Sequence, residues 1–221
     1  MEYQLIRSRR KTIAICIDRE GAVIVRAPLR AAQSVIDRFV CEKQDWIREK
    51  SLQGRQRAEA RRNLQICPGT MLPLMGREYP VRLSDRSGFD GTSILVHSDE
   101  PEQLLLQIKR VYQSVAAAYI QDRIVYYTKI TELTPSGVRI GSANTSWGSC
   151  SGKNRLNFTW KLMMAAPEEI DYVIVHELAH IREHNHSPQF WKLVENVLPD
   201  YRERRKRLNE TGKKLQNQGW G

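Results

Sequence analysis

One helical motif constrains this chain more than any other feature of its 221 residues. His176 and His180 stand four positions apart, which places both side chains on one face of a helix, one turn apart. The helix is predicted from a proline that opens it at Pro167, acidic residues in its first turn and apolar residues at helical spacing. The apolar stripe consists of Ile170, Val173, Ile174, Leu178 and Ile181. We therefore expect a helix that buries one face in a core and presents two imidazoles together.

Glu177 lies between the two histidines and borders the apolar stripe, three positions after Ile174. A carboxylate at such a position is costly to bury without a metal or another cation nearby. Two imidazoles one helical turn apart can bind one zinc ion at about 2.0–2.1 Å. A glutamate beside them can take a proton from a metal-bound water. The sequence therefore predicts a zinc site with His176 and His180 as ligands and Glu177 as general base.

The third ligand must come from further along the chain, because catalytic zinc usually takes three protein ligands and one water. His184 and His186 both follow the motif. Three histidines along one straight helix would be about 5.4 Å apart per turn, too far for the outer two to share an ion. Asn185 can adopt the left-handed conformation that ends helices, and Ser187-Pro188 is typical of a new helix start. We therefore favour His186 as ligand and interpret His184 as a neighbouring polar residue.

The motif and its surroundings resemble the YgjP-like metallopeptidases, which are relatives of the SprT-like and Wss-type zinc proteases. The resemblance rests on His176-Glu177-Leu178-Ala179-His180, Asn185-His186-Ser187-Pro188, Phe190-Trp191, Trp147-Gly148-Ser149-Cys150-Ser151 and the stretch 156–162. It is densest over residues 139–191, and the order of elements extends it over most of the chain. It implies Zn²⁺ as cofactor, His176, His180 and His186 as metal ligands, Glu177 as catalytic base, and a peptide or protein as substrate.

The predicted function is therefore that of a zinc-dependent metallopeptidase, in which zinc activates a water and Glu177 passes its proton to the leaving amine. Tyr201, Arg202 and the segment around Trp147 are unranked candidates for stabilising the oxyanion. Two alternatives stay open. A zinc hydrolase of a non-peptide amide would use the same chemistry. A nucleic-acid-binding protein with a structural zinc would need a fourth protein ligand, for example His184 or Cys150.

The charge balance indicates a further partner. The chain has 35 Lys and Arg against 25 Asp and Glu, a net charge of +10, and such a protein attracts DNA or other polyanions through its summed field. The predicted contacts are the arginines of the C-terminal tail, namely Arg202, Arg204, Arg205 and Arg207. No run of residues reaches the roughly 18 apolar positions of a membrane span. The scattered cysteines form no CxxC pair, and the N-terminal segment is polar, so we expect a cytoplasmic protein without a membrane partner.

The fold predicted is α+β, with an N-terminal region of β-hairpins and helices over residues 1–130 and a zincin-like catalytic region over residues 131–221. In the latter, the HExxH helix packs on a small sheet. Hairpins are expected at 12–17 with 22–27 and at 71–74 with 79–83, a strand at 93–97, and helices at 34–57, extended to 63, and from Pro101 to about 127. Strands at 138–140 and 155–162 should flank a loop at 141–152. The strand at 155–162 is either a core strand or an edge strand that binds substrate by main-chain pairing.

Overall fold

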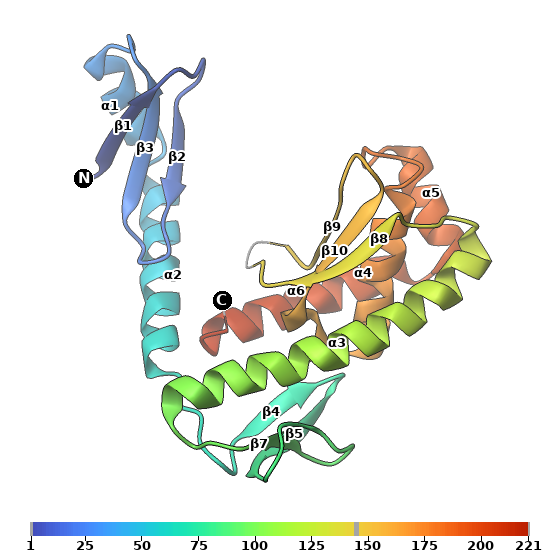
Figure 1. Cartoon of the computed structure of the whole chain (residues 1–221). Coiled ribbons are helices and arrows are strands. Elements are labelled where there is room, and N and C mark those ends of the chain that lie inside the picture. The colour runs from blue at the N-terminus through green and yellow to red at the C-terminus, as the bar shows by residue number, and fades with distance from the viewer. Residues whose placement is uncertain (1, 144–145, 221) are drawn as a thin grey trace. The chain divides into compact units, whose positions relative to one another are not determined.

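The computed structural model describes residues 2–143 and 146–220, and its described part is a mixed α+β fold of six α-helices and three small sheets (Figure 1). This confirms the predicted fold class. The chain forms two compact units, Met1–Leu64 with Gly212–Gly221, and Gln65–Thr211. The predicted regions 1–130 and 131–221 do not coincide with these units, because the helix that ends near residue 130 packs on elements from both regions. None of the described helices is long and apolar enough to cross a membrane.

The N-terminal unit is built on a three-stranded sheet of order β1-β3-β2, formed by Gln4–Ser8, Val23–Pro28 and Ala14–Ile17. β2 and β3 pair antiparallel, which confirms the first predicted hairpin, and β1 adds in parallel to β3. β1 was not predicted, because its segment is polar and basic and only some of its residues are shielded from solvent. Val23, Val25 and Ala27 of β3 are buried in one cluster with Ile36 and Val40 of the first helix.

The predicted helix over residues 34–57 is in fact two helices, α1 (Gln33–Glu42) and α2 (Gln44–Asn63), separated at Lys43. The predicted extension to residue 63 is helical, and it is not wholly exposed, since Ala58 is buried. The last residues of the chain complete this unit, where Leu215 and Trp220 are buried. Gly219 lies so close to α2 that a side chain there would meet the carbonyl oxygen of Ala60 at 2.6 Å.

The second unit begins with a sheet of order β4-β5-β7-β6, formed by Met71–Leu74, Arg77–Leu83, Ile94–Val96 and Gly88–Phe89. β4 and β5 form the second predicted hairpin. The long helix α3 (Pro101–Thr131) follows, as predicted from Pro101, and ends where Glu132 adopts the left-handed conformation. Its buried positions recur at helical spacing and pack on β7, on β8 and on the helix of the motif. α3 therefore connects the β4-β5-β7-β6 sheet to β8 and to the helix that carries His176 and His180.

The sheet beside the motif consists of β8 (Gly137–Gly141), β9 (Gly148–Cys150) and β10 (Arg155–Thr159), in the order β8-β10-β9. The prediction of a loop throughout 141–152 was wrong, because residues 148–150 pair antiparallel with β10. Asn144 and Thr145 of that loop lie outside the described residues. The predicted strand 155–162 ends at Thr159 and continues as a 3₁₀ turn, η1 (Trp160–Met164). β10 lies between two partners, so it is a core strand rather than an edge strand.

Three helices complete the unit: α4 (Pro167–Ala179), α5 (Pro188–Val197) and α6 (Tyr201–Asn217). α4 packs against α3, α5 and β9. Its orientation on α3 is fixed by a bidentate ion pair, in which Arg123 Nε and Arg123 Nη2 donate to the two carboxylate oxygens of Asp171 at 2.7 and 2.8 Å. Bonding to Asp171 raises the pKa of Arg123, so the guanidinium stays charged at any ordinary pH.

We predict that Asp171→Asn lowers the free energy of unfolding by about 2 kcal/mol, because it leaves a partly buried guanidinium without its anionic partner. The side chains of Arg123 and Asp171 are 27% and 13% exposed. Glu203→Gln is the matched control, since its pair with Arg207 is open to solvent and 3.8 Å long, and its removal should cost less than about 0.5 kcal/mol. Denaturant unfolding of both variants measures the difference, and equal stabilities would contradict a role for the pair in holding α4.

Candidate metal centre

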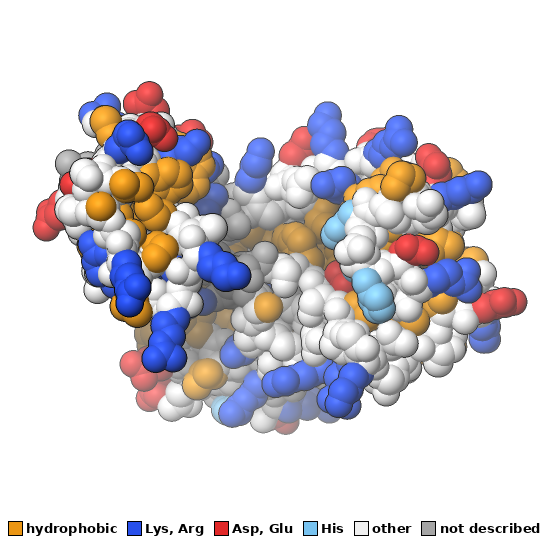
Figure 2. All heavy atoms as spheres, turned by 90° about the horizontal axis from the view of Figure 1, so that it is seen from above, with side chains coloured by type: hydrophobic (Ala, Val, Ile, Leu, Met, Phe, Trp, Pro, Cys, Tyr) orange, Lys and Arg blue, Asp and Glu red, His pale blue; other side chains and the backbone are white. Residues whose placement is uncertain are grey.

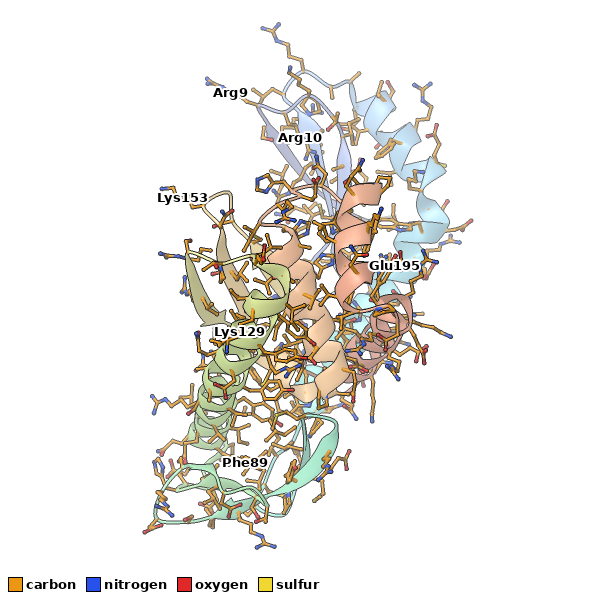
Figure 3. All side chains as sticks on the ribbon, turned by 90° about the vertical axis from the view of Figure 1, so that its right-hand side faces the viewer. Arg9, Arg10, Phe89, Lys129, Lys153 and Glu195 are labelled. Carbon is orange, nitrogen blue, oxygen red and sulfur yellow. The ribbon has the colours of Figure 1, made fainter. Side chains whose placement is uncertain are left out.

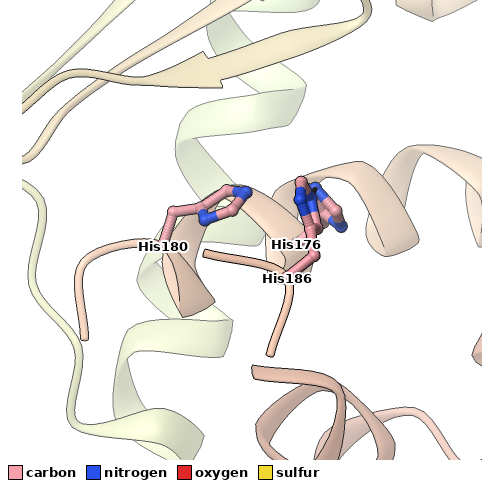
Figure 4. Close-up of side chains that lie close together, drawn as sticks. All are labelled: His176, His180 and His186. Carbon is pink, nitrogen blue, oxygen red and sulfur yellow. Dashed lines mark hydrogen bonds between the residues drawn. The ribbon is translucent and has the colours of Figure 1, made fainter. Parts of the chain in front are cut away.

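Three imidazoles converge at the end of α4, and they are the three histidines that the sequence predicted as ligands (Figure 4). One ring nitrogen from each of His176, His180 and His186 can be chosen so that all three atoms lie within 4.8 Å of one another. The ring centroids are 4.9, 5.0 and 4.8 Å apart for the pairs 176–180, 176–186 and 180–186. The first two rings come from α4 and its C-cap, and the third comes from the segment before α5.

A reversal of the chain between α4 and α5 delivers the third histidine. α4 ends with His180 as its C-cap, and the residues after it form tight turns in which Arg182 and Glu183 donate to the carbonyl of Ala179. Ser187 then caps α5, where its hydroxyl accepts a hydrogen bond from the N–H of Phe190 at 3.2 Å. Ser187-Pro188 therefore starts a helix as predicted, with a capping hydroxyl followed by proline at the first position.

Phe190 and Trp191 hold this reversal together. The Phe190 ring is fully buried, and its centroid lies 4.5 to 4.9 Å from the centroids of all three histidines. Trp191 stacks on His186 with centroids 5.6 Å apart and an interplanar angle of 27°. These two aromatic residues therefore pack the turn that delivers His186. Their contacts help to hold the ring of His186 beside the two imidazoles of α4 and its C-cap.

The protonation of His176 and His180 suits a metal. Burial, together with the neighbouring His180 and His186, lowers the pKa of His176 to about 3, so its ring is neutral at pH 7. Burial also lowers the pKa of His180. The Nδ1 of His180 lies 3.0 Å from the carbonyl oxygen of Glu183, and an N–H donated there leaves the Nε2 lone pair free for a metal.

The donor set also fits the size of a small metal ion. The Nε2 atoms of His176 and His186 are 3.1 Å apart, close to the roughly 3.3 Å that separates two nitrogens bound tetrahedrally to zinc at 2.0–2.1 Å. The Nδ1 of His176 is buried and has no hydrogen-bond partner among the described residues, so packing and the facing imidazole determine where this ring lies. His184 and Cys150 are not members of the cluster.

Glu177 is buried beside the imidazoles, on the same helix. Glu177 is 5% exposed as a residue, and burial raises the pKa of its carboxyl to about 7. It makes no ion pair or hydrogen bond with another residue of the described chain. β9 passes directly over it, since a side chain built on Gly148 would meet Glu177 Cγ at 2.7 Å and Oε1 at 2.8 Å. Only glycine therefore allows β9 to lie against this carboxylate.

A buried glutamate thus lies beside three imidazoles, and the sequence of the chain also matches a known family. The model of the YgjP-like metallopeptidase domain matches residues 11–211. The chain belongs to the YgjP-like metallopeptidase family. A similar solved structure is that of the metallopeptidase zymogen of Pyrococcus abyssi abylysin, with 27% sequence identity over 40% of this chain and 90% of that chain, and a TM-score of 0.38. No match is found among curated proteins.

Membership of the YgjP-like family confirms the predicted resemblance and supports a metallopeptidase, which is a hydrolase that requires a metal. The histidine cluster is a site that could hold that metal. The metal is not identified by the family match, and a relation to SprT-like proteases stays a prediction.

Arg205 lies close to the histidine cluster of this YgjP-like protein. The sequence indicated Arg205 only as a contact for a polyanion. Its guanidinium carbon lies 5.2 Å from the centre of the Trp191 ring, and that ring stacks on Tyr201 with centroids 5.3 Å apart. Burial raises the pKa of Tyr172 to about 12, and the charge of Arg205 opposes this rise. The same charge adds to the lowering of the His176 pKa that burial causes. Packing of α6 on α5 brings this cation to the site, and no spacing in the sequence indicates it.

We predict that Gly148→Ala lowers peptidase activity by about 10²-fold, the cost of moving a reacting group by about 1 Å, while the metal content stays unchanged. The added methyl group must displace Glu177 or β9. Gly152→Ala is the matched control, because a side chain at residue 152 meets nothing within 4 Å. Activity and bound metal are measured on both purified variants. Full activity in Gly148→Ala would show that this contact does not position the carboxylate.

Proposed function

We propose that this protein is a zinc-dependent peptidase in which His176, His180 and His186 bind the metal and Glu177 is the general base. The observation that carries the proposal is the convergence of three imidazoles next to a buried carboxylate that has no partner in the described chain. Neutral imidazole nitrogens are preferred ligands of zinc, and a set of three leaves one position open, as catalytic zinc sites require.

A zinc ion held by these histidines would supply a Lewis acid that polarises a carbonyl and lowers the pKa of a water molecule. Glu177 supplies the proton transfers. Burial raises its pKa to about 7, so near neutral pH it can accept a proton from the attacking water and then donate that proton to the leaving amine. The low polarity around Glu177 strengthens each of these interactions, because few solvent dipoles compete with them.

The substrate is proposed to be a peptide in extended conformation that lies along β9. Among the described residues β9 pairs with β10 only, and it runs directly past Glu177. An open strand edge offers unpaired N–H and C=O groups to a peptide main chain. This favours a peptide over another kind of amide, since a compact amide would make no use of the strand edge. Arg205 is proposed to bind a carbonyl or carboxylate oxygen of the same substrate.

The alternative of a structural zinc site lacks support from the geometry. Such a site needs four protein ligands, and the cluster in the described chain contains three, with neither His184 nor Cys150 among them. Cys150 lies near Glu177 rather than among the ligands, and burial followed by the charge of Glu177 raises the pKa of its thiol. A protonated thiol is a poor zinc ligand.

Metal content tests the ligand assignment. The purified protein should contain about one zinc per chain, the stoichiometry of a single catalytic site. His186→Ala should lose most of this zinc, because the two ligands that remain, His176 and His180, are too few to hold it. His184→Ala should retain the zinc. Elemental analysis after dialysis against a weak chelator measures both. Zinc that persists in His186→Ala and disappears from His184→Ala would overturn the assignment of the third ligand.

Glu177→Gln tests the general base. The amide keeps the shape of the side chain but cannot accept the proton, so we expect hydrolysis of a peptide or of an unfolded protein to fall by about 10²–10⁴-fold. Zinc content should stay at the wild-type level. Glu183→Gln, which removes a nearby carboxylate outside the metal cluster, should leave the activity close to wild type. If zinc-loaded Glu177→Gln hydrolyses the substrate at the wild-type rate, Glu177 is not the base.

A further inference from the structure

The positive charge of the protein is concentrated in its N-terminal unit. Residues 1–64 and 212–221 contain 17 Lys and Arg against 8 Asp and Glu, whereas residues 65–211 contain 18 against 17. The unit that holds the candidate metal centre is therefore nearly neutral. The smaller unit thus carries almost all of the net charge of +10. Catalysis by the histidine cluster does not need this positive charge, so the charge calls for a separate explanation.

The tail arginines that we predicted as polyanion contacts are already engaged. Arg204 Nε lies 2.8 Å from the carboxylate of Asp200, and Arg207 is paired with Glu203 at 3.8 Å. Arg202 faces Glu195 at 4.0 Å, and Arg205 lies over the Trp191 ring. This face of α6 alternates in charge and offers little net attraction to phosphates. The location that we predicted for polyanion binding is therefore not the one that the charges favour.

The strand register gathers basic residues at one end of the β1-β3-β2 sheet. Ser8, the last residue of β1, pairs with Pro28 at the end of β3, and Ala14, the first residue of β2, pairs with Arg26. The loop that joins β1 to β2 and the loop that joins β3 to α1 therefore leave the sheet at the same end. The two loops supply four cations and β3 supplies a fifth near the same end, and together we call them the basic end: Arg9, Arg10, Lys11, Arg30 and, from β3, Arg26. Arg9 and Arg10 are labelled in Figure 3.

None of the five side chains of the basic end has an ion pair or a hydrogen bond with another residue of the described chain. Four are exposed, and Arg10 is half-buried with its Nε buried and unpartnered. Residues 5–14 and 26–34 contain no acidic residue. The nearest acid of α1, Asp37, accepts hydrogen bonds from Tyr3 and Gln33. Basic side chains border an apolar patch on this unit in Figure 2. Five like charges held together cost free energy through mutual repulsion unless an anion neutralises them.

We propose that the basic end binds the phosphate backbone of double-stranded nucleic acid. Four of its five cations are arginines, whose planar guanidinium groups match phosphate oxygens two at a time. Residues 5–14 and 26–35 contain no aromatic side chain, so the surface lacks the rings on which unpaired bases stack. Contacts of this kind recognise backbone charge without sequence preference. The N-terminal unit would thereby place the peptidase near proteins bound to the same duplex, and the binding itself does not depend on the proposed catalytic function.

Salt-dependent binding of the full chain to a fluorescent DNA duplex tests this proposal. Each phosphate that is neutralised releases counterions, so the logarithm of affinity should fall linearly with the logarithm of salt concentration. The variant Arg9→Gln, Arg10→Gln, Lys11→Gln, Arg30→Gln should bind at least about 10-fold more weakly at low salt and lose about 3 from the slope. A second variant that retains Arg10 guards against a folding effect of its half-buried side chain and should lose about 2–3 from the slope. Unfolding temperatures are measured for both.

The matched control removes the same charge from the other unit, through Arg82→Gln, Arg86→Gln, Arg110→Gln and Lys153→Gln, all of which replace exposed side chains. It should keep the wild-type affinity and slope. Equal losses in the test and control variants would mean that only net charge matters, and would overturn the proposal. So would the absence of duplex binding at low salt. Leu29 is exposed beside the basic end, so vesicles with anionic lipids are tested as well, and binding to vesicles but not to duplex would assign the surface to a membrane instead.

Discussion

The candidate metal centre depends on one reversal of the chain, between His180 and Ser187. α4 alone can place two imidazoles on one face, and a straight continuation would carry any later histidine away from them. The tight turns after Ala179 and the serine cap of α5 bring His186 back to within 3.1 Å of His176. Phe190 packs against all three rings. Catalytic geometry in this protein is therefore set by packing of a loop on a helix, and a change at Phe190 would reach the ligands without touching the metal.

Much of this arrangement could be predicted from the sequence, because local rules determine it. The spacing of His176 and His180, the proline at the start of α4, and Ser187-Pro188 each have one structural meaning, and the structure has each feature where it was expected. The apolar spacing that begins at Pro101 likewise identified α3. These features are encoded within one or two helical turns, so no knowledge of distant contacts was required.

Most of the features that sequence reasoning missed are determined by distant contacts. β9 is only three residues long and becomes a strand because β10 pairs with it. Gly148 matters because Glu177, 29 positions later, lies directly under it. Arg205 reaches the site through the packing of Trp191, and β1 exists because β3 offers a parallel partner. α1 and α2 are separated at Lys43, where the residues give no clear stop signal, so a single helix was predicted there. Pairing and packing of this kind leave little trace in local composition.

The N-terminal unit is discontinuous in sequence, since residues 212–221 complete a body that begins at residue 1. Trp220 and Leu215 are buried in it, and Gly219 closes against the carbonyl of Ala60. This body is complete only when the segment after Thr211 has packed on it, whereas the other unit is one continuous segment that can fold without waiting for a distant part of the chain. Bringing the two parts of this unit together also closes a loop of about 150 residues. Closing a loop of this length costs conformational entropy, and contacts between such distant residues form slowly. The unit that holds the candidate metal centre can therefore mature before the basic unit is complete.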